Sequence, residues 1–145
     1  MVKPLTIAEV EYIAHQLAQR LLEWDEPIPE FGTRFPNVLE SCLAAPFQTF
    51  TRRPLYRGLI GKAAMLFYLM VKNHPFKNGN KRIAMTTLLA LLLKNGKWLR
   101  MDDHALYRFA KWVAESDPKV RAAVVAAIEK MVQSHLIAAP KPRTS

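Results

Sequence analysis

Cysteine is almost missing from this chain of 145 residues, in which Cys42 stands alone. A single cysteine cannot form an intrachain disulfide, and it excludes a metal site built from cysteines. The chain also lacks apolar runs of bilayer length, because the strongest, 59–71 and 83–93, are short and typical of buried core helices. The start of the chain reaches acidic residues before any long apolar run, unlike a secretory signal. We therefore expect a cytoplasmic protein that does not associate with membranes.

Acidic residues are missing from the middle of the chain. Between Glu40 and Asp102 there is none, while eleven Lys and Arg residues occur there. Residues 1–50 carry a net charge of −4 and residues 51–145 a net charge of +13. Such a field attracts phosphates, nucleic acid or an acidic protein partner, and a merely solvated surface is the alternative. Because the chain has no helix-turn-helix or zinc pattern, we do not expect nucleic acid to be the partner.

Strand signals are scarce, whereas helix signals are plentiful. Thr6 and Glu9 form a capping-box pattern, and Asn37 with Glu40 repeats the capping logic. Two further helices are apolar at nearly every position and should be buried on most sides. The expected helices are 6–24, 37–45, one from 56 or 57 to 73, 80–94, 103–115 and one opened by Asp117. The sequence thus predicts one all-α domain over residues 1–145, a bundle of about six helices with two central buried helices joined by a polar loop.

The polar loop is HPFKNGNKR, residues 74–82, and its end has the features of an anion site. Gly79 and Asn80 lead directly into the second central helix, whose N-terminal N–H groups and positive dipole end face whatever lies there. Lys81 and Arg82 follow in the first turn, where cations oppose the helix dipole. A bound anion would offset that conflict, so the sequence predicts a cradle for phosphates.

The first half of the loop holds a candidate base and an anchor. His74 is the one group in the loop whose ordinary pKa suits proton abstraction near neutral pH. Phe76 is apolar and should insert into the core, which would hold the loop in shape. A His-Pro pair after a helix and a glycine beside basic residues are each common on their own, so a purely structural loop is the alternative.

Taken whole, the nonapeptide resembles the signature of the Fic/Doc superfamily. That signature is a histidine, any residue, a phenylalanine, two further positions, then Gly/Ala, Asn, Gly/Lys and Arg. At the position of Lys81, Fic enzymes have a second glycine, whereas the Doc branch, the death-on-curing toxins, has lysine. The chain therefore resembles the Doc branch at this position. Segments such as LTIAEVEYIAHQLAQR and LLALLLKNGKW extend the likeness over roughly residues 5–100. The resemblance implies an all-α fold with the signature loop between two central helices.

The resemblance also implies an activity. The matching histidine, His74, would be the general base on a hydroxyl of a target protein, and the matching Asn80 and Arg82 would hold nucleotide phosphates. Doc toxins transfer the γ-phosphate of ATP to a threonine of elongation factor Tu, whereas Fic enzymes transfer AMP, which is the alternative reaction. Met85 lies where AMP-transferring enzymes have a further arginine, which favours the Doc branch.

Two departures from the Fic pattern bear on cofactor and regulation. In most of the superfamily, the residue before the signature glycine is acidic and holds Mg²⁺. The residue at that position here is Asn78, which has no charge. The metal could be held chiefly by the nucleotide, Lys81 could replace part of its charge, or the chain is a catalytically weakened binding homologue. The self-inhibitory pattern of Fic proteins, Ser/Thr, three residues, Glu and Gly/Asn, does not occur. Inhibition should then come in trans from an acidic antitoxin.

Overall fold

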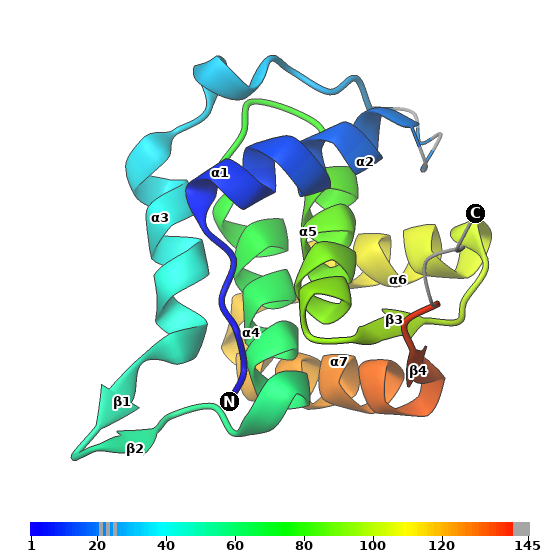
Figure 1. The fold of residues 1–145 in the computed structure, drawn as a ribbon. Helices are drawn as coiled ribbons and strands as arrows, with labels where there is room; N and C mark the ends of the chain where they lie inside the picture. Colours follow the sequence, from blue (N-terminus) through cyan, green and yellow to red (C-terminus); the bar gives the residue numbers. More distant parts are fainter. Residues whose placement is uncertain (21, 23, 25, 141–145) are drawn as a thin grey trace, which may run out of the picture.

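The computed structural model describes residues 1–20, 22, 24 and 26–140. They form a helical bundle with two short two-stranded sheets at its margins (Figure 1). The principal helices are α3 (Pro36–Ala44), α4 (Gly58–Asn73), α5 (Asn80–Lys94), α6 (Asp103–Glu115) and α7 (Arg121–His135). Before them, an N-terminal helical segment consists of α1 (Ile7–Glu9), a π-helical part (Val10–His15) and α2 (Gln16–Arg20). The predicted all-α architecture is confirmed.

The central pair α4 and α5 forms the core, as the apolar runs predicted. Every residue from Ala63 to Val71 is buried, and so is every residue from Ile83 to Leu92. α4 packs against α3, α5, α6 and α7, while α5 packs against α4, α6 and the N-terminal segment. Helices that are apolar all round need cover on all sides, and this arrangement supplies it. The loop between them, residues 74–79, is thereby held by two rigid helices.

The start of the first helix is confirmed and its end is not. Thr6 Oγ1 accepts from the Glu9 N–H and Glu9 Oε1 accepts from the Thr6 N–H, which is the predicted capping box. The helix was expected to reach Trp24, but α2 ends at Arg20, and Leu22 and Trp24 are not helical. The physical reason is tertiary: the Arg82 guanidinium binds the Leu22 carbonyl at 2.6 Å and directs this segment towards the loop.

The prediction that Asn37 caps the short helix is wrong. α3 begins at Pro36, whose fixed φ suits the first helical position, and Phe35 is the N-cap. The Phe35 N–H donates to the Pro75 carbonyl at 2.9 Å, so α3 starts where the 74–79 loop holds it. At the other end of the chain, Asp117 accepts from the Lys119 N–H, as expected of an N-cap. There it opens a 3-10 turn, Pro118–Val120, that leads into α7.

Two small antiparallel sheets were not predicted. β1 (Thr49–Phe50) pairs with β2 (Arg53–Pro54) in a hairpin that projects from the bundle, and Arg52 at its tip has φ +67° (Figure 1). β3 (Lys97–Leu99) pairs with β4 (Leu136–Ala138) and joins the end of α5 to the end of α7. Strands of two or three residues are too short to leave an alternating pattern in the sequence. Among the described helices, none combines the length and the apolar character needed to cross a membrane.

Candidate functional site

The loop 74–79 is built by two residues with left-handed backbone, one at each end. His74 ends α4 with φ +51°, and Gly79 precedes α5 with φ +69°. Only glycine adopts this region at no steric cost, and at Gly79 space is short as well. A Cβ there would lie 2.9 Å from Ile28 Cδ1 and 2.9 Å from the Pro27 carbonyl oxygen. Gly79 therefore serves both the turn and the close approach of the segment that precedes α3.

Inside the loop, Phe76 and Asn80 hold each other in place. The Phe76 ring is 1% exposed and packs near His15 and Phe31, with ring centroids 6.3 and 5.8 Å away. Asn80 Oδ1 accepts from the Phe76 N–H at 3.0 Å, and Asn80 Nδ2 donates to the Phe76 carbonyl at 2.8 Å. Phe76 lies in the core, and its role as the anchor of the loop stays a prediction. The Asn80 amide closes the loop in the free protein, and its predicted contact with phosphate stays a prediction.

Several of the predicted site residues meet in one pocket beside this loop. Its volume is about 220 Å³, and it lies between the loop, the start of α5 and the end of α6. The lining residues are Glu26, Val71, His74, Lys77, Asn78, Asn80, Lys81 and Ala114. His74 is exposed on the pocket rim, so its ring is open to a ligand or a partner. Arg82 is not among the lining residues.

The carboxylate of Glu26 lies at the N-terminus of α5, where the sequence predicts that an anion binds. Glu26 Oε2 accepts from the Gly79 N–H at 3.0 Å, and Glu26 Oε1 forms a hydrogen-bonded ion pair with Lys81 Nζ. Asn78 Oδ1 accepts from the same Gly79 N–H at 2.9 Å. Burial acts to raise the pKa of Glu26, but Lys81, the Gly79 N–H and Arg82 outweigh it and hold that pKa below its ordinary value. Sequence reasoning missed Glu26, which lies 53 residues before Gly79.

Arg82 binds backbone carbonyls. Its NH1 donates to the Leu22 carbonyl at 2.6 Å, and its NH2 donates to the Glu26 carbonyl. Burial lowers the pKa of Arg82, and the charges of Glu26 and Asp103 oppose that effect. Arg82 thus fixes the segment that carries Glu26, and the phosphate contact predicted for it stays a prediction.

The side chains of the pocket do not make a protein-built Mg²⁺ site. Mg²⁺ prefers carboxylate and other hard oxygen donors in a near-octahedral shell. The pocket offers the neutral amide oxygen of Asn78, which already accepts a hydrogen bond, and the Glu26 carboxylate, which is paired with Lys81. Within residues 1–20, 22, 24 and 26–140, no three His, Cys, Asp or Glu residues gather as a metal-binding group.

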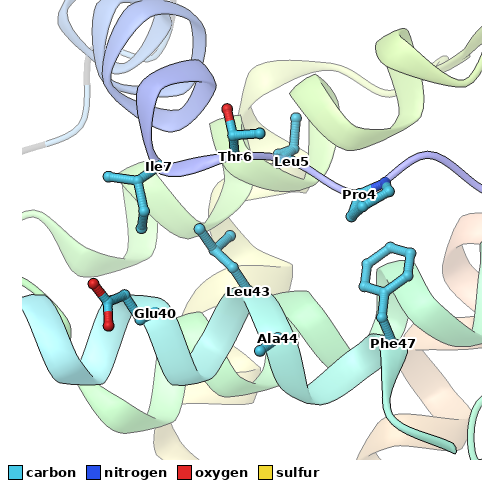
Figure 2. A pocket seen from close by; sticks show the side chains of 8 residues that line it. All are labelled: Pro4, Leu5, Thr6, Ile7, Glu40, Leu43, Ala44 and Phe47. Carbon is cyan, nitrogen blue, oxygen red and sulfur yellow. The ribbon is translucent and has the colours of Figure 1, made fainter.

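A larger hollow lies elsewhere and does not suit phosphate chemistry. Its volume is about 390 Å³, and it lies between residues 4–7 and the chain from α3 to Phe47 (Figure 2). Aliphatic and aromatic side chains dominate its wall, and the Glu40 carboxylate in that wall would repel an anion. The lining residues are Pro4, Leu5, Thr6, Ile7, Glu40, Leu43, Ala44 and Phe47. The pocket beside the loop is smaller than this hollow, but its lysine and the N-terminus of α5 suit a phosphate better.

Comparison with known proteins agrees with the motif. A family model described as the Fic/DOC family matches residues 4–92, which is more than half of the chain. The chain belongs to the Fic/DOC family. Members of this family are typically transferases that act on nucleotides. The match contains the whole loop, α4 and nearly all of α5. No match was found among curated proteins or among solved structures.

Proposed function

We propose that this Fic/DOC chain is a Doc-like toxin that transfers the γ-phosphate of ATP to a hydroxyl of a target protein of the translation elongation factor class. The observation that carries the proposal is one pocket that joins His74, Asn78 and Lys81 at the positive end of α5. A base and an anion cradle on adjacent sides of one pocket are what phosphoryl transfer requires.

The chemical step needs little from the protein beyond position and charge. The target hydroxyl gives its proton to a ring nitrogen of His74 while its oxygen bonds to the γ-phosphorus, and the bond between that phosphorus and ADP breaks. Charge on the transferring oxygens is stabilised by the N-terminus of α5 and by Lys81. His74 is the C-cap of the buried helix α4, so its backbone is held in place, and its exposed side chain is accessible to a target hydroxyl.

Lys81 supports the γ-phosphate reaction over the transfer of AMP. Its side chain lines the pocket and pairs with a carboxylate there, so it takes up space that a glycine would leave open. Independently of Lys81 and Met85, which favour the Doc branch, Asn78 provides no charge for Mg²⁺. We infer that a divalent ion would arrive with the nucleotide and be coordinated mainly by nucleotide oxygens. A cognate acidic antitoxin would complete the toxin–antitoxin pair.

Isotope labelling separates the candidate activities. The purified protein is incubated with a bacterial lysate, Mg²⁺ and ATP labelled at either the γ or the α phosphate. Label transferred from the γ position supports the kinase, and label from the α position identifies an AMP transferase. No transfer from either position by the folded protein contradicts the catalytic proposal and identifies a binding homologue.

Variants at two histidines control the labelling experiment. His74→Ala should abolish both protein labelling and growth arrest in cells that express the chain. His104→Ala removes an exposed histidine of α6 that does not line the pocket, and it should leave both effects unchanged. Equal labelling by the two variants would show that His74 is not the base.

A further inference from the structure

We propose that a second pocket next to His74, here named the α3 pocket, is the acceptor subsite, which binds an uncharged polar stretch of the target polypeptide beside the hydroxyl that is modified. The α3 pocket has a volume of about 410 Å³ and is lined by Asn37, Val38, Ser41 and Asn73. That volume lies within the roughly 300–1,000 Å³ typical of ligand pockets. The inference rests on the proposed function, since it gives the second substrate of that reaction its place.

The α3 pocket and the pocket beside the loop lie on different sides of the end of α4. Val71 lines the pocket beside the loop, whereas Asn73 lines the α3 pocket. Residues two apart in a helix are separated by about 200° around its axis, so these two side chains point in nearly opposite directions. The helices that complete the walls, α6 for one pocket and α3 for the other, lie on either side of α4 (Figure 1). His74 follows Asn73 directly and lines the pocket beside the loop, so the candidate base lies where the two pockets adjoin.

Both walls of the α3 pocket are held in place relative to His74. One wall ends in Asn73, the last residue of α4 and the neighbour of His74 in the chain. The other wall is α3, whose N-cap Phe35 donates its N–H to the Pro75 carbonyl at 2.9 Å. A polypeptide bound between these walls would be held in a defined position relative to the base, which is what the positioning of an acceptor requires.

The side chains of the α3 pocket suit a polypeptide better than a phosphate. Asn37 and Ser41 are four residues apart, so they share one exposed face of α3, and Asn73 of α4 lines the same pocket. Carboxamides and hydroxyls both donate and accept hydrogen bonds, so this set matches the N–H and C=O of peptide groups. All four lining side chains are uncharged, whereas cations such as Lys81 in the other pocket are the groups that bind phosphate.

The two pockets also fit the geometry of the reaction. In phosphoryl transfer, the attacking and leaving oxygens lie roughly in line with the transferring phosphorus. A nucleotide in the pocket beside the loop and an acceptor in the α3 pocket would approach His74 from different sides of α4. The acceptor hydroxyl would thus reach the base and the phosphorus from the side away from the leaving group.

Labelling of lysate proteins from γ-labelled ATP, at rising lysate concentration, tests the α3 pocket. Asn37→Ala removes one or two hydrogen bonds to the acceptor, so at low lysate concentration we expect roughly three- to tenfold less label than with the wild-type chain. The difference should shrink at high lysate concentration, because weaker acceptor binding raises KM and leaves kcat unchanged.

A pair of tryptophan variants tests the same pocket by filling it. Ser41→Trp places a large ring in the α3 pocket and should reduce labelling by about tenfold or more. Ser134→Trp adds the same bulk at an exposed position of α7 outside both pockets, and it should label like the wild type. Calorimetric titration should give the wild type and all three variants one affinity for ATP, because the nucleotide binds in the other pocket.

The outcomes separate the acceptor subsite from the proposed function. If Asn37→Ala and Ser41→Trp label like the wild type at every lysate concentration, the α3 pocket is not the acceptor subsite, although the transferase activity stands. Weaker ATP binding by these variants, or a loss of label by Asn37→Ala that is equal at all lysate concentrations, also overturns the inference. If Ser41→Trp does not fold, Asn37→Ala alone decides. If the wild type transfers no label, the proposed function fails and the acceptor subsite fails with it.

Discussion

Replacing Asn80 should destabilise the free protein, because its amide closes the signature loop in the absence of any ligand. Asn80 is 7% exposed, and both ends of its amide bind the backbone of Phe76, at 3.0 and 2.8 Å. A neutral hydrogen bond contributes about 1 kcal/mol net, and a buried backbone group left without a partner costs about 1–3 kcal/mol. Asn80→Ala removes both bonds, so we expect a loss of about 2–4 kcal/mol in the free energy of unfolding.

Thermal and urea unfolding without nucleotide measure this loss. A change of 1 kcal/mol shifts Tm by roughly 2–4 °C in a chain of this size, so Asn80→Ala should unfold roughly 5–15 °C lower. Asn80→Asp retains an acceptor for the Phe76 N–H but loses the donor to the Phe76 carbonyl, so it should also destabilise at neutral pH. Asn37→Ala, at an exposed position of α3, is the control and should change stability by about 0.5 kcal/mol or less. If Asn80→Ala unfolds like the wild type, Asn80 serves only the ligand and the loop-closing role is refuted.

Three further predictions concern the surroundings of the loop. Phe76→Ala should cost about 3–5 kcal/mol, measured by urea unfolding, because its ring is 1% exposed in the core. Lys72→Met should cost about 1–2 kcal/mol in the same assay, because Lys72 Nζ donates to the carbonyls that end α6, including that of Ser116 at 2.6 Å. The lowered pKa of Glu26 favours its ionised form in the folded state, so its contribution is complete above the ordinary value of 4.5 and is lost as pH falls through the folded pKa. Stability measured against pH should show this loss in the wild type and a smaller one in Glu26→Gln, and equal slopes would contradict it.

The helices that the sequence predicted well are those whose signal is local. α4 and α5 are apolar at almost every position. Their observed bounds, Gly58–Asn73 and Asn80–Lys94, agree closely with the expected helices, the first from 56 or 57 to 73 and the second 80–94. The predicted anion site at the α5 N-terminus also rests on local signals, namely glycine, cations and the helix dipole in consecutive positions, and it stays a prediction. Local signals of this kind do not depend on which distant segment packs against them.

The features that the sequence did not reveal depend on distant segments. The end of the first helix is set by Arg82, which is 60 residues from Leu22, and the pairing of Lys81 with Glu26 spans 55 residues. The start of α3 is likewise tied to the Pro75 carbonyl. Propensity and periodicity describe neighbours along the chain, whereas these contacts arise only after the bundle has formed. An excess of acidic residues in the first 50 positions was the one signal available, and it gave no partner for any particular residue.

The charge imbalance between the two parts of the chain corresponds to ion pairs between them. The stretch without carboxylates contains Lys81 and Lys94, and both obtain one from the acidic N-terminal part: Glu26 pairs with Lys81, and Glu9 with Lys94 at 2.6 Å. Pairing with Lys94 anchors the N-terminal segment at the end of α5, far from the pocket, whereas pairing with Lys81 fills the pocket itself. A carboxylate is therefore present beside the uncharged Asn78: Glu26 accepts from the same Gly79 N–H as Asn78 and is paired with Lys81. Any ligand of this pocket must then displace Glu26 or bind beside it, and the affinity of Glu26→Gln for ATP distinguishes these two cases.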